Sequence, residues 1–476
     1  MKRFIPLAAI LLLACCSSDE NPQPDFGLRK GCTVPISDNF DPEAQIDDGS
    51  CQPIACSKCT YTIPAGKVVI DGNELGIGAG DVICLDAAIN YLNLNFKNII
   101  GTSGNPVTIV NCGGVVTMNA TGKGFGIKTE NSRHFKITGV GSGGSPYGIK
   151  LHGAQQGMQL LALSTNFEIS GLEIYNAGFA GIMAKTDPTC DNATIRGNFV
   201  MQHVAIHHNY IHDTGGEGLY IGNSFYAEGV SVSGCGTRMP HEIRGLRVFQ
   251  NVVKNTAWDA IQIGCATDDI EVYNNTAENF GTENKTGQWS GIQVGEGSGG
   301  LYYNNLIKHG KGQGLNILGL GEATFYNNVI FDVERNGIFS DLRGTGPFGS
   351  GYKIINNTVV SPGIDGIVVY AKDVTKNVVI NNLVVDPGSY GNYGSNTAKA
   401  FLNVGAAAPI EQSNNYFAET TGDARFQAAG SGDFRLLTDS PAKDAGKDVS
   451  GHSITTDFLG TARPKGAGYD IGAFEF

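Results

Sequence analysis

Glu217 and Asp259 are the two acidic side chains whose positions best suit chemistry. Each stands directly before a short β-prone segment that opens with a small residue and an aliphatic one. Two carboxyl groups held close together can divide the work of an acid and a base, or can hold Ca²⁺ through their oxygens. The same slot before later segments holds the polar residues Ser290, Gln313, Asn336 and Asp365. An architectural role for this slot therefore stays open.

Lys185 and Tyr220 are the candidate proton acceptors of the same region. In these alternating segments the aliphatic residue after the opening glycine points inward and the next residue points outward. One outward column reads Lys150, Met183, Tyr220, Gln262, Gln293 and Asn316, and the next reads His152, Lys185, Gly222, Gly264 and Gly295. Long polar side chains beside glycines predict an open polar groove across the segments. An amine or a phenol in such a groove can take a proton from a bound molecule.

A long excursion, residues 223–244, interrupts the spacing between two of these segments. It carries Arg238 and His241, and a disulfide between its Cys235 and Cys190 would hold it beside Asp187. Long loops on a rigid scaffold commonly form binding walls. The residues that we expect to contact a bound molecule are Lys150, His152, Asp187, Arg238, His241, Gln262 and Gln293.

Internal repeats indicate which elements must position these residues. An asparagine-rich pair closes successive β-prone runs, and its second member recurs at Asn209, Asn251, Asn275, Asn305, Asn328, Asn357 and Asn382. Such short strands cannot each bury an apolar face alone, whereas coils stacked about 4.8 Å apart can. The asparagines would then form a ladder of side-chain amides. The density of glycine and asparagine and the period-two alternation exclude a run of helices.

Four histidines, His203, His207, His208 and His212, suggest a metal cluster, but the repeats argue against it. Aligned on the asparagine pairs, His207 falls in a column with Phe249, Tyr273, Tyr303 and Tyr326. This alignment predicts a stack of side chains along the coils. The next residue, His208, falls among the asparagine pairs themselves, so we favour structural roles.

The repeat pattern resembles the pectate-lyase-like superfamily of right-handed parallel β-helices. Residues 80–85 and 101–109 resemble a segment frequent in lyases acting on alginate and dermatan-type glycans, and residues 440–475 resemble the closing module of many secreted β-helix proteins. The resemblance implies an all-β solenoid over residues 60–415 and a capping segment, residues 416–476, that covers the last coil. It also implies an extracellular polysaccharide lying across the stacked strands.

Two reactions on such a polysaccharide fit the candidate residues. In β-elimination, Lys185 or Tyr220 removes the proton beside a uronate carboxylate. The cation that neutralises this carboxylate would be Arg238, Lys150, or Ca²⁺ held by the acidic pair. We favour this lyase reaction.

Glycoside hydrolysis is the alternative, with Glu217 and Asp259 as acid and base or nucleophile. A third reading is a non-catalytic, glycan-binding or adhesive surface protein that uses the same groove, because fold alone does not determine function. A titratable pair with converging geometry would favour an enzyme, whereas a flat amide and tyrosine face would favour a binder.

Residues 1–15 resemble a lipoprotein signal peptide. Lys2 and Arg3 precede an apolar run too short to span a bilayer, and Leu12-Leu13-Ala14-Cys15 resembles a lipobox. Cys15 would carry the lipid, and residues 16–30 would form a polar tether. We expect an outer-membrane lipoprotein at the cell surface, with the periplasmic face as the alternative, and a monomer.

Composition agrees with an exported, folded protein. The 476 residues are 41% hydrophobic and 16% charged, which argues against disorder. The net charge of −12 gives no long-range attraction to nucleic acid, which we exclude as a partner.

The 11 cysteines indicate disulfides formed in an oxidising compartment. We predict the pairs Cys32–Cys51, Cys84–Cys112 and Cys190–Cys235. The first pair would bound a small module, residues 31–51. The single CxxC motif at residues 56–59 has no second copy, which favours structural disulfides over a zinc or redox site.

Overall fold

The computed structural model describes residues 29–476, except 33, 35, 38, 45, 48, 49, 143 and 390–398. The predicted signal peptide with its lipobox Cys15 and nearly all of the tether lie outside the described residues. Within the described residues, no helix is long and apolar enough to cross a membrane.

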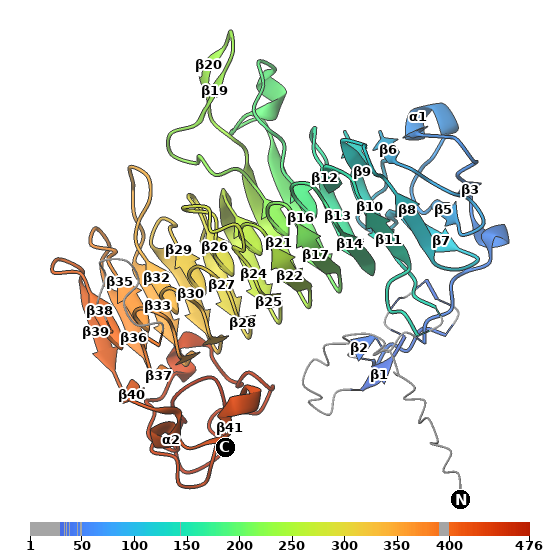
Figure 1. Ribbon diagram of the computed structural model, residues 1–476. Helices are drawn as coiled ribbons and strands as arrows, with labels where there is room; N and C mark the ends of the chain where they lie inside the picture. The colour runs from blue at the N-terminus through green and yellow to red at the C-terminus, as the bar shows by residue number, and fades with distance from the viewer. Residues whose placement is uncertain are drawn as a thin grey trace, which may run out of the picture.

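Three long parallel sheets wind around one core as the predicted right-handed β-helix (Figure 1). A complete coil contributes one strand to each sheet, and strands inside a sheet pair with the equivalent strands of the coils before and after them. The sheets begin at Tyr61 and end at Ala418.

The strands of each sheet follow in stacking order. The 13-stranded sheet contains β3 (Tyr61–Thr62), β5 (Val82–Asp86), β7 (Val107–Cys112), β10 (Arg133–Thr138), β13 (Thr165–Ser170), β16 (Val200–His207), β21 (Glu242–Phe249), β24 (Ala266–Tyr273), β27 (Gly300–Tyr303), β30 (Glu322–Tyr326), β33 (Gly351–Ile355), β36 (Asn377–Ile380) and β39 (Ile410–Ser413). The 11-stranded sheet contains β8 (Val116–Asn119), β11 (Ile149–His152), β14 (Leu172–Tyr175), β17 (Tyr210–Thr214), β22 (Val252–Thr256), β25 (Thr276–Glu278), β28 (Leu306–Lys308), β31 (Val329–Phe331), β34 (Thr358–Val360), β37 (Leu383–Val385) and β40 (Tyr416–Ala418). The 12-stranded sheet contains β4 (Val69–Asp71), β6 (Leu94–Lys97), β9 (Phe125–Glu130), β12 (Gln156–Leu160), β15 (Ile182–Ala184), β18 (Leu219–Ile221), β23 (Ile261–Ile263), β26 (Ile292–Val294), β29 (Leu315–Ile317), β32 (Ile338–Ser340), β35 (Ile367–Val369) and β38 (Leu402–Val404).

Few elements lie outside these sheets. They are the paired strands β1 (Lys30–Gly31) and β2 (Ile46–Asp47), β19 (Val230–Val232) and β20 (Gly236–Arg238), β41 (Phe426–Ala428) and β42 (Asp433–Leu436), and the helices α1 (Gly72–Leu75) and α2 (Thr421–Ala424).

Alternation along the strands builds the core. In the 12-stranded sheet the residue after each opening glycine or alanine is fully buried, as at Ile182, Leu219 and Ile261. Burying such a side chain contributes about 1.5–3 kcal/mol, and each coil repeats the contribution against its neighbours. The predicted glycine–aliphatic marks open strands of this sheet in every case except Gly148-Ile149.

The asparagine ladder is present at the turn from the 13-stranded to the 11-stranded sheet. The side-chain amide of each ladder asparagine donates to the amide oxygen of the next, at 2.9–3.0 Å from Asn209 through to Asn415. The same nitrogens also bond buried main-chain carbonyls of the preceding coil. The ladder therefore satisfies polar groups that a turn beside the core would otherwise leave unpaired.

The predicted ring stack is also confirmed. His207, Phe249, Tyr273, Tyr303 and Tyr326 lie in line on the outer face of the 13-stranded sheet, with ring centroids 4.5–5.0 Å apart and ring planes within 10°. His208 stands at the turn with φ 52°, like the first residue of the later asparagine pairs. These histidines have the structural roles that the repeats indicate.

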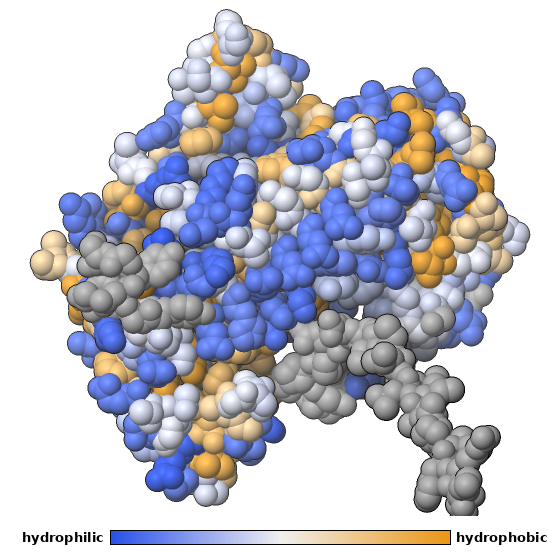
Figure 2. All heavy atoms as spheres, in the orientation of Figure 1, coloured by the Kyte–Doolittle hydropathy of each residue, from blue (hydrophilic) through white to orange (hydrophobic). Residues whose placement is uncertain are grey.

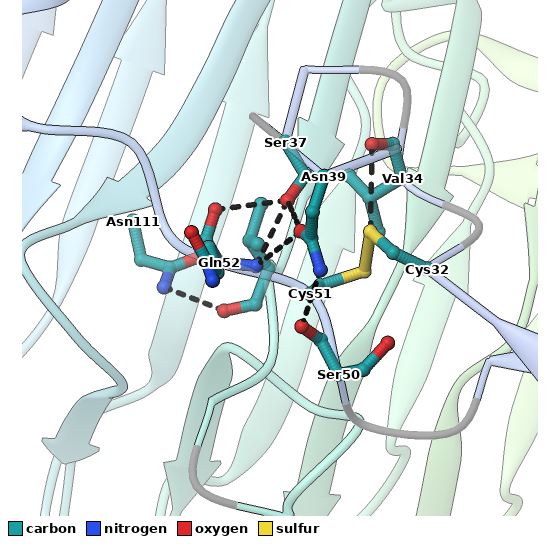
Figure 3. The surroundings of a disulfide bond; sticks show 9 residues. Cys32, Val34, Ser37, Asn39, Ser50, Cys51, Gln52 and Asn111 are labelled. Carbon is teal, nitrogen blue, oxygen red and sulfur yellow. Dashed lines mark hydrogen bonds between the residues drawn. A yellow bond between two sulfur atoms is a disulfide. The ribbon is translucent and has the colours of Figure 1, made fainter. Parts of the chain in front are cut away.

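The small N-terminal module is held to the first coils. Cys32 and Cys51 form the predicted disulfide, and Ser37 and Asn39 accept hydrogen bonds from the backbone N–H of Gln52 (Figure 3). Val34 packs with Ile54 and with buried residues of the first coils. The module is thus continuous with the end of the solenoid.

Of the other predicted disulfides, Cys190–Cys235 is confirmed and Cys84–Cys112 is wrong. Cys84 pairs with Cys59, and Cys112 pairs with Cys56. In the pairing of β5 with β7, Cys84 and Cys112 lie on the side of the sheet that faces away from the core, where they pack with Cys56 and Cys59 of the CxxC segment. Both cysteines of that motif are therefore structural.

The C-terminal segment lies along the flank of several coils instead of covering only the last one. The first asparagine of the pairs points outward, and Asn327, Asn356, Asn381 and Asn414 donate to carbonyls of this segment. Its apolar side chains cover Val329, Val360, Leu383 and Val385 on the outer face of the 11-stranded sheet. The segment therefore seals a sheet face (Figure 1).

Candidate functional site

The 12-stranded sheet forms the floor of the predicted groove. Its strands pair so that Met183, Tyr220, Gln262, Gln293 and Asn316 form one outward column, as predicted. Within this column Gln262 is only 2% exposed and Gln293 only 5%. Ser224 of the excursion lies against this column and accepts a hydrogen bond from the Gln262 amide at 2.8 Å.

Lys150 and His152, predicted to continue these columns, lie on a different face. They belong to β11, which pairs with β8 and β14 in the 11-stranded sheet. Lys150 forms an ion pair with Glu173 at 2.7 Å, and His152 stacks on Tyr175. The floor of the groove continues instead through Gln159, which is in register with Met183. Neither predicted residue can touch a molecule in the groove.

Lys185 and Tyr220 are brought together as predicted. The Lys185 ammonium lies 4.6 Å from the centre of the Tyr220 ring and 2.8 Å from a carboxylate oxygen of Asp187. Burial lowers the pKa of Lys185, but the interactions with Tyr220 and Asp187 outweigh it and hold this pKa above its ordinary value. Lys185 is therefore a stable cation, which suits charge neutralisation better than proton uptake.

Tyr220 connects the two sides of the floor. Its hydroxyl lies 3.2 Å from the Ser224 hydroxyl, which accepts a hydrogen bond from the Gln262 amide at 2.8 Å. Asn223 donates to Asp187, which closes the network at the other end. Ser224 and Asn223 are functional candidates that the sequence reasoning missed, although they open the excursion that it singled out.

The excursion forms a wall above this network, and its β19–β20 hairpin projects from the body of the molecule (Figure 1). Its disulfide to Cys190 and hydrogen bonds from Arg238 to the backbone of Thr189 and Cys190 fix the hairpin. The backbone N–H of Ala227 donates to the buried Glu296 carboxylate at 3.0 Å. The wall is therefore held from two other coils.

His241 does not line the groove. It is fully buried, its Nε2 accepts a hydrogen bond from the backbone N–H of Thr186, and its Nδ1 faces the carbonyl of Glu242. Burial lowers its pKa, which keeps the ring neutral. His241 and Arg238 thus hold the wall in place, whereas contact with a bound molecule was predicted for both.

Glu217 and Asp259 lie on successive coils at the edge of the groove floor and are 2% and 0% exposed. One oxygen of each, Glu217 Oε2 and Asp259 Oδ2, has no hydrogen-bond partner. Burial raises the pKa of Glu217 to about 7 despite Lys285 and Lys185. Burial, together with the neighbouring Glu217 carboxyl, raises the pKa of Asp259 to about 8.

The later residues of this column explain part of the arrangement. Asp259 accepts from the backbone N–H of Ser290, and Gln313, Asn336 and Asp365 accept from the backbone of the following coil in the same way. The slot is therefore a second side-chain ladder. Since Ca²⁺ takes six to eight oxygen ligands, and no third acidic or histidine ligand among the described residues converges on this pair, the pair alone does not fit that ion.

Aromatic side chains line the edge opposite the wall. Phe179 contacts both Tyr220 and Trp258 edge to face, at centroid distances of 6.4 and 5.3 Å. The ammonium of Lys285 lies over the Trp258 ring, and the Arg335 guanidinium lies over the ring of Trp289. This rim was missed because its residues stand in turns, outside the alternating segments.

A family model supports the fold. Residues 228–404 match the model described as a right handed beta helix region. No curated protein sequence matches the chain.

Several solved structures are similar in fold. The pectate lyase Pel9A has 14% identity and a TM-score of 0.43, and the alignment covers 88% of this chain and 96% of that one. A lacto-N-biosidase from Eubacterium ramulus has 10% identity and a TM-score of 0.47, with 76% and 68% covered. An alginate lyase from Paenibacillus sp. str. FPU-7 has 15% identity and a TM-score of 0.32, with 75% and 99% covered. At these identities the likeness concerns the fold alone.

Proposed function

We propose that the chain cleaves an acidic polysaccharide by β-elimination in the groove of the 12-stranded sheet. The observation that carries this proposal is the Lys185 ammonium beside the Tyr220 ring, which is flanked by Ser224 of the excursion and by Phe179 of the aromatic rim. A fixed cation and an adjacent phenol are the two groups that the reaction needs at one point of the substrate.

In the proposed reaction, Lys185 pairs with the uronate carboxylate and makes the neighbouring C–H more acidic. Tyr220, acting in its deprotonated form, takes the proton and leaves an enolate-like intermediate. The bond from the ring to the glycosidic oxygen then breaks, a C=C double bond forms, and the departing oxygen takes the proton back from Tyr220. The tyrosine and the lysine end in their starting states.

The hydrolytic alternative is less compatible with the geometry. Glu217 and Asp259 would have to reach a glycosidic bond and its water, yet both are almost completely buried. Their raised pKa values also leave neither as a reliable base near neutral pH. We assign them to the support of the groove floor.

Polysaccharides tested with and without EDTA give the direct test, with unsaturated-uronate absorbance and reducing ends measured together. We expect absorbance and reducing ends to rise together, and Tyr220→Phe or Lys185→Ala to lower the rate at least about 100-fold. Tyr326→Phe, on the outer ring stack, is the matched control and should retain full activity.

Other outcomes would redirect the assignment. Reducing ends without absorbance would return the assignment to hydrolysis. Binding without either signal would leave a glycan-binding protein. Loss of activity in EDTA would show a metal requirement that the acidic pair alone does not explain. The lipid on Cys15, the cell-surface location and the monomeric state remain predictions, and acyl labelling of wild type against Cys15→Ala tests the first.

A further inference from the structure

A cleft of about 540 Å³ lies on the outer face of the 13-stranded sheet, on a different sheet from the Lys185–Tyr220 groove. It spans β10, β13 and β16 and is closed at one end by the loop 102–106. Its lining includes the polar side chains of His134, Asn166, Gln202 and His203. The molecular face in the orientation of Figure 1 is largely hydrophilic across its middle (Figure 2).

A kink in the strands aims three of these side chains into one line. His134, Asn166 and His203 have φ of 53°, 54° and 47°, in the left-handed region. The register of the flanking residues places them opposite one another on successive coils. Since stacked strands are about 4.8 Å apart, the three side chains present hydrogen-bonding groups over about 10 Å.

The positive φ of this column continues beyond the cleft, but the residues there offer no unpaired polar side chain. The next two positions in the column are Gly245 and Asp269, also at positive φ, and Asp269 forms an ion pair with Arg247 at 2.6 Å. In contrast, the side chains of His134, Asn166 and His203 make no hydrogen bond or ion pair within the described part of the chain. The backbone geometry is architectural, whereas these unpaired polar groups are specific to the cleft.

A small residue creates the hollow. The neighbouring outward column carries long charged side chains at Lys136, Glu168 and Arg247, but the position between the last two is Ala205. The alanine leaves open the space that a long side chain would fill. The hollow is therefore built into the register of the strands.

The lysine and the glutamate that line the cleft neutralise each other. Lys136 pairs with Glu168 at 2.7 Å, and His207 lies 3.5 Å from the same carboxylate. These partners outweigh burial and lower the pKa of Glu168 to about 2, so the carboxylate stays ionised and neutralises the lysine. A polyanion would find no lysine in this cleft without an ion-pair partner. Hydroxyl groups, in contrast, match the amide and imidazole groups, which both donate and accept hydrogen bonds.

We propose that this cleft is a second, non-catalytic site for a linear, uncharged, hydroxyl-rich glycan, held by His134, Asn166 and His203. The site is independent of the proposed reaction, because it lies on another sheet and shares no residue with the groove. It would let the protein hold a neutral glycan while the groove acts on an acidic one.

Affinity electrophoresis of the full chain tests this site, in gels containing neutral glucan, galactomannan or, for comparison, pectate. The Asn166→Gly/His203→Gly double variant removes two side chains but keeps the backbone, since glycine adopts positive φ readily and Gly245 already occupies this column. Ala205→Leu fills the hollow without charge, as Leu301 does in the same column. Asn274→Gly, at φ 54° in a turn away from the cleft, is the control.

Wild type and Asn274→Gly should be retarded by a neutral polysaccharide. The double variant should bind at least about fivefold more weakly, as expected for loss of a net hydrogen bond of about 1 kcal/mol, and Ala205→Leu should run unretarded. Equal retardation of all variants, or no retardation of wild type by any neutral polymer, would overturn the proposal. Because these gels report binding alone, a failure of the lyase assay leaves this result unchanged.

Discussion

Asp259, which is buried beside Glu217, belongs to a side-chain ladder but brings an unpaired oxygen into it. The amides in the same slot of later coils accept a backbone hydrogen bond without carrying charge. Asp259 makes the same bond but leaves its second oxygen unpaired beside Glu217. A buried carboxyl in this position avoids the cost of a buried charge by remaining protonated.

Asp259→Asn should therefore stabilise the protein much more at pH 8 than at pH 5, with little effect only below the ordinary pKa of 3.8. Between the ordinary pKa of 3.8 and the raised value of about 8, the folded chain holds a proton that the unfolded chain releases, so stability falls as pH rises through this window. An asparagine at this position can still accept the hydrogen bond from the backbone N–H of Ser290, and its side chain does not titrate. Thermal unfolding across pH 5–9 should show a gain of more than about 1 kcal/mol at the alkaline end.

Glu217→Gln should give the same pattern over a narrower range, since its raised pKa is about 7. Asp332→Asn, in an exposed turn, serves as the control and should leave the pH profile unchanged. An equal shift at every pH would mean that packing, not protonation, distinguishes the variants.

For single residues, the sequence predicted the position of a side chain correctly where the strand register was unambiguous. Alternation placed Tyr220, Gln262 and Gln293 in one column, and the meeting of Lys185 with Tyr220 follows from it. Lys150 was misplaced because Gly148-Ile149 opens a strand of the 11-stranded sheet with the same alternation. Only the pairing partners distinguish the two sheets, and a sequence does not display them.

At the scale of elements, the asparagine ladder joins coils whose strands are too short to be stable alone. Asn305 receives bonds from the backbone and side chain of Asn275 and donates to Asn328 and to the carbonyl of Val272. All four of these hydrogen bonds are buried. An interior asparagine thus holds two turns at once.

Asn305→Ala should lower the free energy of unfolding by at least about 2 kcal/mol, because it leaves several buried polar groups without partners. Asn415→Ala, at the half-buried end of the same ladder, should cost less. Denaturant midpoints with unchanged slopes would check both values. Equal losses at the two positions would argue that the ladder is not cooperative along its length.

The wall is an element of another kind, because its position depends on one covalent link and a few hydrogen bonds. Replacing both Cys190 and Cys235 by alanine should release the hairpin while leaving the coils folded. We expect faster proteolysis within residues 223–244, a lower rate of polysaccharide cleavage and a nearly unchanged main unfolding transition. Loss of the main transition would show that the wall belongs to the folding core.

For the whole molecule, the C-terminal segment acts as a side plate, and Arg463 joins the turns of this segment to one another and to Asn327 of the coils. Arg463 and Glu475 form a fully buried ion pair, and Arg463 also donates to Asn327 and to the carbonyl of Gly472. Removing one partner of such a pair costs about 3–5 kcal/mol because the other charge stays buried and uncompensated.

Arg463→Met should detach this segment and expose the apolar face of β31, β34 and β37. Limited proteolysis and binding of a hydrophobic dye should both increase, while the remaining solenoid stays folded. Arg435→Met, which breaks an exposed pair with Asp433, is the control and should change stability by no more than about 1 kcal/mol. Similar behaviour of the two variants would contradict the proposed attachment.

The stacking of the coils was more predictable than the disulfides and the C-terminal segment that join or cover them. Repeated asparagine pairs and alternating segments predict stacked coils because no other arrangement buries strands of this length. The disulfides of Cys84 and Cys112 and the path of the C-terminal segment were mispredicted, since both depend on which surfaces meet after the coils have formed. The first asparagine of each pair, such as Asn356, points outward and could have indicated where the C-terminal segment docks. The ladder formed by the second asparagines already explained the pairs, so this indication was overlooked.

The aromatic rim has an optical consequence. The chain contains two tryptophans, Trp258 and Trp289, and both lie on that rim with a cation over the indole ring. All of the intrinsic indole emission of this 476-residue protein therefore originates beside one groove. A sugar that displaces Lys285 or Arg335 would change this emission directly. The native protein thus carries an unlabelled fluorescence reporter for the groove that is silent to occupancy of the cleft on the 13-stranded sheet.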